Sequence, residues 1–321
     1  MNEPLAMVVV NEGEQKLADP LNGGLPKVNP ALAYLASLHS ETSVKTMRSK
    51  LKVFAQWAGY SDVDTCPWDA LRPDVVVAFV AYLDHSGHSP ATNNAYLAAL
   101  KSVAKMGWVS EVISHETYLR IKAIKGQKSH RLPSGRSLSY EESGALLESC
   151  DVNDIKGCRD KLIFSLMLGC GLRRAEICTL RFEKYDPQER SFRVIGKGDK
   201  ERIVFLPEPV VSVLQYWIEN YRGDMDGLLF GRIYKNQRLS LSQPMDPTTI
   251  GRIVQQRMES ANQRSATAHD LRRSFATRLL EKKVDLVTVK NMMGHANIAT
   301  TAMYDRRGEE AMQEATKDIK L

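Results

Sequence analysis

Long apolar runs are missing from this sequence. No stretch approaches the roughly 18 consecutive apolar residues that a membrane-spanning helix needs. The run from Met7 to Val10 is too short for the core of a signal peptide, and Glu3 precedes it where basic residues are expected. The sequence therefore predicts a soluble, cytoplasmic protein with no membrane partner.

Paired cysteines are also missing. The cysteine count is odd, and no C-x-x-C pair occurs among Cys66, Cys150, Cys158, Cys170 and Cys178. A disulfide framework or a zinc site would need an even set or closely spaced thiols. The sequence therefore predicts a protein of a reducing compartment, with no metal site.

Two further signatures are absent. The sequence has no G-x-x-x-x-G-K-[ST] loop to cradle a nucleoside triphosphate. It also has no evident carboxylate cluster of the kind that a two-metal nuclease needs. No cofactor is therefore expected, and ATP-driven and magnesium-dependent chemistry are disfavoured.

What the sequence does have is enough apolar material for a core and a small excess of basic charge. Hydrophobic residues make up 43% of the 321 residues, and 26% are charged, so wholesale disorder is excluded. Lys and Arg number 44 against 38 Asp and Glu, for a net charge of +6. This balance permits a polyanionic partner without requiring one.

The first half of the chain predicts a small helical domain. Residues 1–28 contain Pro and Gly with little periodicity and are interpreted as a flexible lead. From 29 to 125 apolar residues recur at helical spacing, as in the stripe Val44, Met47, Leu51, Phe54 and Ala58. Thr42 or Ser43 is the expected cap of that helix. Further helices are expected over Pro73–Asp84, from Ser89 through Val103, and near Glu116–Ile124.

Residues 126–138, GQKSHRLPSGRSL, predict a linker because Gly126, Pro133 and Gly135 stand among polar residues. No acidic residue occurs between Thr117 and Tyr140. The basic residues near the linker and on two helix faces are Lys45, Arg48, Lys52, Lys101, Lys105, Lys125, Lys128, Arg131 and Arg136. These are candidate contacts to a phosphate backbone, although solvated linkers and solvated helix faces have the same composition.

The second half, residues 139–307, predicts an α+β domain. Helices are expected over 139–150, 154–168, just after Gly171, and over 209–222, 247–261, 270–282 and 285–293. The segments SFRVI and RIVFL read as two strands joined by the turn GKGDKE. Residues 308–321 form a tail in which Met312, Ala315 and Ile319 share one helical face.

Five short motifs follow one another in this second domain: GLRRAE with Arg173 and Glu176, GKGDKER with Lys197, HDLRRSFAT with His269 and Arg272, MMGH with His295, and TTAMYDR with Tyr304. Each has an ordinary structural explanation when taken alone, such as a surface ion pair or a solvated turn. Their order and spacing together favour a functional set.

With these motifs in this order, the sequence resembles the tyrosine site-specific recombinases, also called the phage integrase family. The resemblance covers about Leu162 to Arg306, and it extends more weakly over the first domain, which looks like the family's core-binding domain. It implies a mainly α fold with a small β-sheet: a helical core-binding domain and an α+β catalytic domain. Arg273 stands where many members have His, and Met293 where Leu is usual.

The resemblance implies an active site of Arg173, Lys197, His269, Arg272 and His295 around Tyr304, with Glu176 supporting Arg173. Two guanidiniums can hold the non-bridging oxygens of a phosphodiester. Tyr304 would attack the phosphorus and form a 3′-phosphotyrosine link, with His269 accepting the phenol proton and His295 donating a hydrogen bond to the phosphate. Lys197 would donate a proton to the leaving 5′ oxygen.

The same resemblance implies double-stranded DNA with a specific recombination site as the partner, held between the two domains as in a clamp. It further implies a homotetramer on two DNA duplexes, joined through the C-terminal tail. The expected setting is a bacterial nucleoid, or a phage or mobile element. Because the lead is short, the chain is expected to lack an additional arm-binding domain.

Two alternatives remain open at the level of sequence. A type IB topoisomerase-like enzyme shares this chemistry and would relax supercoiled DNA without a site requirement. A DNA-binding protein that has lost catalysis would keep the fold, although the intact set of six residues argues against it.

Overall fold

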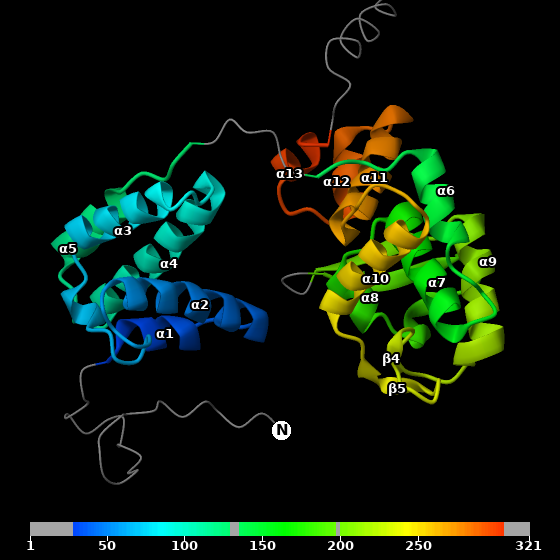
Figure 1. Ribbon diagram of the computed structural model, residues 1–321, viewed down its shortest axis with the longest axis horizontal. Helices are drawn as coiled ribbons and strands as arrows, with labels where there is room; N and C mark the ends of the chain where they lie inside the picture. Colours follow the sequence, from blue (N-terminus) through cyan, green and yellow to red (C-terminus); the bar gives the residue numbers. More distant parts are fainter. Residues whose placement is uncertain (1–27, 129–134, 197–199, 305–321) are drawn as a thin grey trace, which may run out of the picture. The chain divides into compact units, whose positions relative to one another are not determined.

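The computed structural model describes residues 28–128, 135–196 and 200–304, which divide into two compact units, Met1–Arg131 and Leu132–Leu321. Each unit has its own buried core (Figure 1). Residues 1–27 of the predicted lead, Arg131, Lys197 and the tail 308–321 lie outside the described residues. The domain limits drawn from the sequence stay a prediction.

Unit 1 is helical over the residues described. Its elements are α1 (Pro30–Ala36), α2 (Glu41–Trp57), the 3₁₀ turn η1 (Trp68–Ala70), α3 (Pro73–His85), α4 (Pro90–Val109) and α5 (His115–Ala123). The core is rich in aromatic rings: Phe54 of α2 stacks on Trp68 at 5.3 Å and meets Phe79 of α3 edge-on at 5.1 Å. Such pairs add directional packing to the burial of apolar area.

The start of α2 differs from the prediction. Its cap is Ser40, whose hydroxyl accepts a hydrogen bond from the Ser43 amide at 3.1 Å. Thr42 and Ser43 lie inside the helix, so the predicted cap was wrong. The reason is local: a capping hydroxyl must lie ahead of the amide it satisfies, and three serines and threonines compete within four residues. Ser89 does cap α4, as the sequence predicted.

Unit 2 is built around one largely buried helix, α7. Its helices are α6 (Tyr140–Glu148), α7 (Ile155–Cys170), α8 (Arg174–Thr179), α9 (Glu208–Trp217), α10 (Pro247–Ser260), α11 (Ala268–Glu281), α12 (Leu286–Met293) and α13 (Ile298–Ala302). The helix α7 packs against both α9 and α11 and is buried on nearly every face (Figure 1). Even its charged pair Arg159 and Asp160 is buried, with Arg257 of α10 completing an ion cluster on Asp160.

The β-structure is larger than the predicted hairpin. The strands β2 (Ser191–Ile195) and β3 (Glu201–Phe205) pair antiparallel as expected, and β1 (Tyr185–Asp186) adds a third strand to β2. A second hairpin, β4 (Gly231–Ile233) with β5 (Leu239–Pro244), was missed. Its turn has no glycine, and Gln237 supplies the positive φ instead. The predicted fold class, mainly α with a small β-sheet, is confirmed.

Gly171 ends α7 in the left-handed region at φ 64°. A Cβ at this position would lie 2.4 Å from the Phe275 ring of α11, so the close contact between the two helices requires glycine here. The tight turn leads directly into Arg173, at the start of α8.

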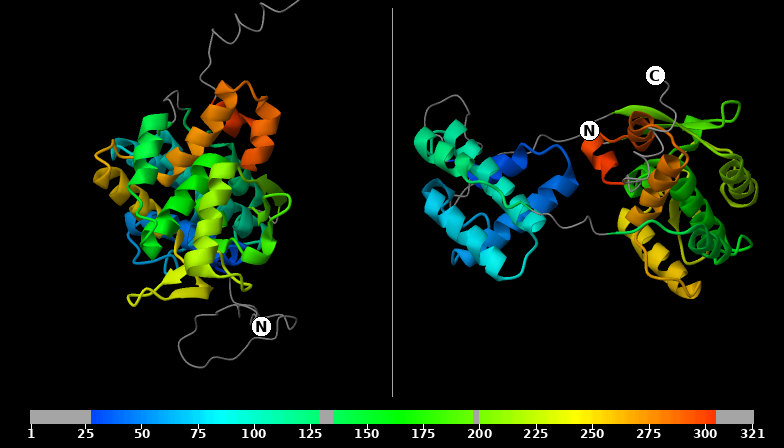
Figure 2. Two further views of the ribbon diagram at one scale, coloured as in Figure 1. Left: turned by 90° about the vertical axis from the view of Figure 1, so that its right-hand side faces the viewer. Right: turned by 90° about the horizontal axis from the view of Figure 1, so that it is seen from above.

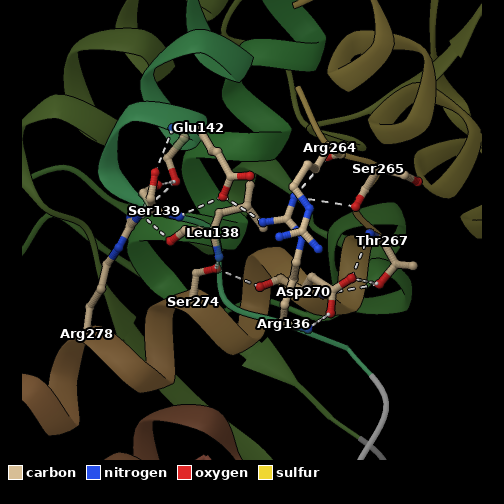
Figure 3. Close-up of polar contacts among 11 residues, drawn as sticks. Arg136, Leu138, Ser139, Glu142, Arg264, Ser265, Thr267, Asp270, Ser274 and Arg278 are labelled. Carbon is tan, nitrogen blue, oxygen red and sulfur yellow. Dashed lines mark hydrogen bonds and ion pairs between the residues drawn. The ribbon is translucent and has the colours of Figure 1, made fainter. Parts of the chain in front are cut away.

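The segment 135–139 is fastened along α11 by polar contacts (Figure 3). The Arg136 amide donates to Asp270 at 3.0 Å, the Leu138 amide donates to the Ser274 hydroxyl at 2.7 Å, and Arg278 donates to the Ser139 carbonyl at 3.1 Å. Asp270, Ser274 and Arg278 lie one turn apart on one face of α11. The chain that enters unit 2 is therefore fixed along the helix that carries His269 and Arg272.

The described end of the chain, α12 and α13, lies beside α11 (Figures 1 and 2). Together they enclose a small apolar cluster that includes Phe275, Val289, Met293 and Tyr304. Helix α13 was not predicted, because five residues give too little periodicity to detect. Among the described residues, no helix has the length and apolar character that crossing a membrane requires.

Candidate active site

One buried carboxylate joins two arginines that come from distant parts of unit 2. Glu176 of α8 is 4% exposed. Its oxygens accept from the Arg173 side chain at 2.6 Å and from the Arg173 amide at 2.8 Å, and Arg202 of β3 reaches both oxygens at 2.8 and 2.9 Å. Bidentate charge-assisted bonds of this kind fix orientation as well as distance. The sheet is thereby tied to the start of α8.

The electrostatics of Glu176 follow from these contacts. Burial alone would raise its pKa, but hydrogen bonds from Arg202 and from the Arg173 backbone outweigh burial and lower the pKa to about 2. Glu176 is therefore ionised at neutral pH. Because a single carboxylate faces both guanidiniums, the cluster carries an excess of positive charge.

Arg272 of α11 is held by main-chain oxygens. It is buried, and its two terminal nitrogens donate to the carbonyls of Gly171 and Met293. Burial, and then the charge of Arg173, lower its pKa to about 9, so it stays charged at neutral pH. These two bonds therefore fix the Arg272 guanidinium relative to the ends of α7 and α12.

The turn after α12 brings His295 into the site. Gly294 adopts φ 61°, and its carbonyl accepts from Arg173 at 2.6 Å. A Cβ on Gly294 would lie 3.0 Å from the Arg202 guanidinium, so a side chain here would push Arg202 aside by a few tenths of an ångström. His295 Nδ1 lies 2.9 Å from the Thr301 hydroxyl. Burial and the charges of Arg272 and Arg173 lower the pKa of His295 to about 4, which leaves the imidazole neutral at pH 7.

Tyr304 lies just after α13 and is only 3% exposed. Its hydroxyl is 3.2 Å from His269 Nε2, near the start of α11, and its ring centroid is 5.9 Å from that of His295. Burial and then the charges of Arg273 and Arg272 lower the pKa of His269. A neutral imidazole beside a phenol can accept the phenol proton.

The structure thus brings together five of the six residues that the sequence singles out as catalytic: Arg173, His269, Arg272, His295 and Tyr304. Lys197 lies outside the described residues, although the hairpin that carries it is closed by a Gly196 amide bond to the Lys200 carbonyl at 2.8 Å. Sequence reasoning missed Arg202 and Thr301. Arg202 is the last residue of the GKGDKER motif. Along β3 it lies on the same, less exposed face as Val204, and this alternation is the sequence signal that could have identified it.

Most candidate DNA contacts of unit 1 fall into two groups. Lys45, Arg48 and Lys52 each lie within 4.0 Å of a carboxylate, from Glu41, Asp62 or Asp64. These exposed pairs are weak and are easily exchanged for phosphate. Lys105, Lys125 and Lys128 are exposed. Their part in DNA binding stays a prediction.

Two other candidates have structural partners. Lys101 donates to the Ile124 carbonyl at 2.5 Å and so closes the end of α5. Arg136 donates to Glu142 at 2.6 Å and to the Arg264 carbonyl at 2.9 Å (Figure 3). These bonds favour a structural role for both side chains.

The arrangement suits a phosphodiester. Converging guanidiniums and a neutral imidazole can bind the non-bridging oxygens, and the phenol lies beside a neutral proton acceptor. Over residues 28–128, 135–196 and 200–304, no group of three His, Cys, Asp or Glu side chains is placed to hold a metal ion.

Comparisons with known sequences support this chemistry. The model of the phage integrase family matches residues 136–310, and the model of the phage integrase N-terminal SAM-like domain matches residues 32–106. The tyrosine recombinase XerD of Listeria innocua is 31% identical over 83% of this chain and 88% of its own length. The tyrosine recombinase XerA of Pyrococcus horikoshii is 34% identical over 76% of this chain and 79% of its own.

Solved structures share the fold. A Tn1549 transposon integrase in complex with transposon right end DNA superposes with a TM-score of 0.69 at 18% identity, covering 91% of this chain and 98% of that one. A lambda integrase dimer bound to a core site gives a TM-score of 0.64 at 18% identity, covering 86% and 93%.

The Glu176 cluster predicts a pH-dependent loss of stability. Because its pKa is lowered on folding, Glu176 stabilises the fold above about pH 4.5, and this contribution is lost as the pH falls toward 2. We expect Glu176→Gln to lower the free energy of unfolding by about 3 kcal/mol at pH 7. The difference in free energy of unfolding between the variant and wild type should become smaller below pH 4.5. Urea unfolding followed by circular dichroism measures it.

The matched control is Glu208→Gln, which removes the carboxylate of the exposed Arg190–Glu208 pair in the same unit. That change should cost less than about 1 kcal/mol. Equal losses for the two variants would contradict the special position of Glu176.

Proposed function

The chain belongs to the phage integrase family and is a tyrosine site-specific recombinase, an enzyme that breaks and rejoins DNA, and on this premise we propose that Tyr304 is its nucleophile. The observation that carries the proposal is the 3.2 Å contact between the Tyr304 hydroxyl and His269 Nε2, beside the guanidinium cluster of Glu176. The proposed product is a covalent 3′-phosphotyrosine intermediate that serves integration, excision or resolution of DNA.

The proposed steps follow the positions of the groups. Arg173 and Arg272 bind the non-bridging oxygens of the scissile phosphate, where negative charge grows in the transition state. In the tautomer in which Thr301 donates to His295 Nδ1, the Nε2–H of His295 donates to the same phosphate. Tyr304 attacks the phosphorus, its proton passes to His269, and the bond from phosphorus to the 5′ oxygen breaks.

The leaving strand and the return step complete the exchange. Lys197 gives the 5′ oxygen a proton, so that a neutral hydroxyl leaves. In the second half, a 5′ hydroxyl attacks the phosphotyrosine and Tyr304 leaves as the phenol. One phosphodiester replaces another, so the exchange needs no ATP.

The proposed partner is double-stranded DNA carrying a specific recombination site, on which a homotetramer joins two duplexes through residues 308–321. Support comes from two solved structures with the same fold that are bound to DNA: the lambda integrase dimer on a core site, and XerH bound to difH substrate. The same proposal puts the protein in the cytoplasm, with the DNA it acts on.

The nucleophile is tested with DNA nicked so that cleavage cannot be reversed. Tyr304→Phe should bind the DNA site within about twofold of wild type, because only a hydroxyl is lost, and it should form no SDS-resistant adduct on a denaturing gel. Tyr234→Phe is the control, since Tyr234 lies in the same unit with its hydroxyl on Gln243. Adducts from Tyr304→Phe would remove Tyr304 from the nucleophile's role.

The role of Lys197 as general acid is tested with a substrate whose 5′ bridging oxygen is replaced by sulfur, because the sulfur leaves without needing a proton. Lys197→Ala should slow cleavage of ordinary DNA by about 10²–10³-fold and leave the sulfur substrate nearly unaffected. Lys200→Ala, in the same hairpin, should change neither rate by much. Equal slowing of both substrates by Lys197→Ala would assign the proton to another group.

The tail is tested by deleting residues 308–321. Binding to one DNA site should stay within about threefold, whereas the complex of four chains on two duplexes should be lost in analytical ultracentrifugation. Deletion of residues 1–27 serves as the control for shortening the chain. A truncated protein that still assembles as a tetramer would refute the role of the tail.

A further inference from the structure

Tyr304 is held by two side chains of α11, and only one of them touches its hydroxyl. His269 lies 3.2 Å from the hydroxyl oxygen. Arg273 lies one helical turn further on, with its guanidinium carbon 5.1 Å from the centroid of the Tyr304 ring. Residues four apart share a helix face, so His269 and Arg273 meet Tyr304 together, one at the hydroxyl and one at the ring.

Arg273 differs from its neighbour Arg272, although the two are adjacent in sequence. Arg272 turns to the carbonyls of Gly171 and Met293. Arg273 is 4% exposed and lies beside Asp270, with 3.9 Å between its Nε and the Asp270 carboxylate. A guanidinium over an aromatic face is attracted by the electrons of the ring, more strongly where water is excluded.

Asp270 keeps Arg273 in this place. One carboxylate oxygen accepts from the Thr267 amide and hydroxyl at 2.9 and 2.7 Å, and the other accepts from the Arg136 amide at 3.0 Å (Figure 3). The segment before Arg136 also passes close by, since a Cβ on Gly135 would lie 3.1 Å from an Arg273 nitrogen. The guanidinium thus lies close both to a fixed carboxylate and to the Tyr304 ring.

We propose that Arg273 is a positioning residue for the cleavage reaction: its guanidinium holds the ring of Tyr304 so that the hydroxyl stays on His269. The proposal rests on the proposed role of Tyr304 as nucleophile. It adds a residue that does not touch the phosphate and acts through the tyrosine.

The charge of Arg273 has a second effect at the same place. Burial is the first cause that lowers the pKa of His269, and the charges of Arg273 and then Arg272 are the next. The other charged groups that face His269 are Asp270, which raises the pKa, and Arg174 of α8, which lowers it; Tyr304 and His295 meet it from the chain after α12. Loss of the Arg273 charge should therefore raise the pKa of His269 and leave less neutral imidazole to accept the proton.

The test measures single-turnover formation of the covalent complex on nicked DNA, with the enzyme in excess, across a range of pH. Arg273→Gln should react about tenfold more slowly than wild type at neutral pH. The acid limb of its pH–rate profile should also shift to higher pH, because the pKa of His269 rises. Arg273→Lys keeps the charge, so it should recover most of the rate and the wild-type pH profile.

The control is Arg278→Gln. Arg278 lies on the same helix and also covers a tyrosine ring, that of Tyr140 at 4.4 Å, but it is fastened to Ser139 and Ser143. Its loss should lower the melting temperature and leave the pH profile unchanged. The profile does not depend on how much of a variant is folded, and Arg273→Met gives a second neutral side chain if Arg273→Gln is poorly soluble.

The outcomes separate the two proposals. If Tyr304→Phe forms the covalent complex as wild type does, the proposed nucleophile fails. If wild type reacts and Arg273→Gln matches it in rate and pH profile, the positioning role of Arg273 is overturned. It is overturned equally if Arg273→Lys is as slow as Arg273→Gln and both keep the wild-type profile, because Arg273 would then only support the fold.

Discussion

The site depends on the ion cluster of Glu176. A buried carboxylate is tolerable only when its charge is compensated, and Glu176 receives bonds from the Arg173 backbone, the Arg173 side chain and both ends of the Arg202 guanidinium. The compensation exceeds the charge of the carboxylate, so positive charge remains. The cluster therefore combines enough negative charge to keep the arginines in place with too little to neutralise them, which suits the phosphate-binding role proposed for Arg173 and Arg272.

Main-chain carbonyls also hold Arg173 and Arg272 in place. Gly171, Met293 and Gly294 each present a carbonyl to Arg173 or Arg272. These carbonyls lie at the ends of α7 and α12, where helical oxygens have no partner within the helix. The close packing of α7 against α11, as of Gly171 against Phe275, therefore helps to place the Arg272 guanidinium.

The sequence predicted the helices with long apolar periodicity and the central hairpin, because burial of one face dictates both. It also singled out Tyr304 and four residues that lie together around it: Arg173, His269, Arg272 and His295. It missed β1, the β4–β5 hairpin and α13, which are too short to show a period, and it misplaced the cap of α2. Arg202 was passed over because a charged residue is assumed to be exposed unless its partners are known, and Arg273 was noted only as a departure from the family pattern and given no role. Those partners, Glu176 and Tyr304, become neighbours only through the tertiary fold.

Gly294 limits how this enzyme can be altered. Its left-handed backbone turns the chain into His295, its carbonyl accepts a hydrogen bond from Arg173, and a Cβ here would lie only 3.0 Å from Arg202. Glycine at this position thus meets three requirements at once. Alanine, the smallest replacement, keeps the carbonyl, but it is strained by the left-handed backbone and brings a Cβ close to Arg202. Any mutant library made from this chain should therefore keep codon 294 constant.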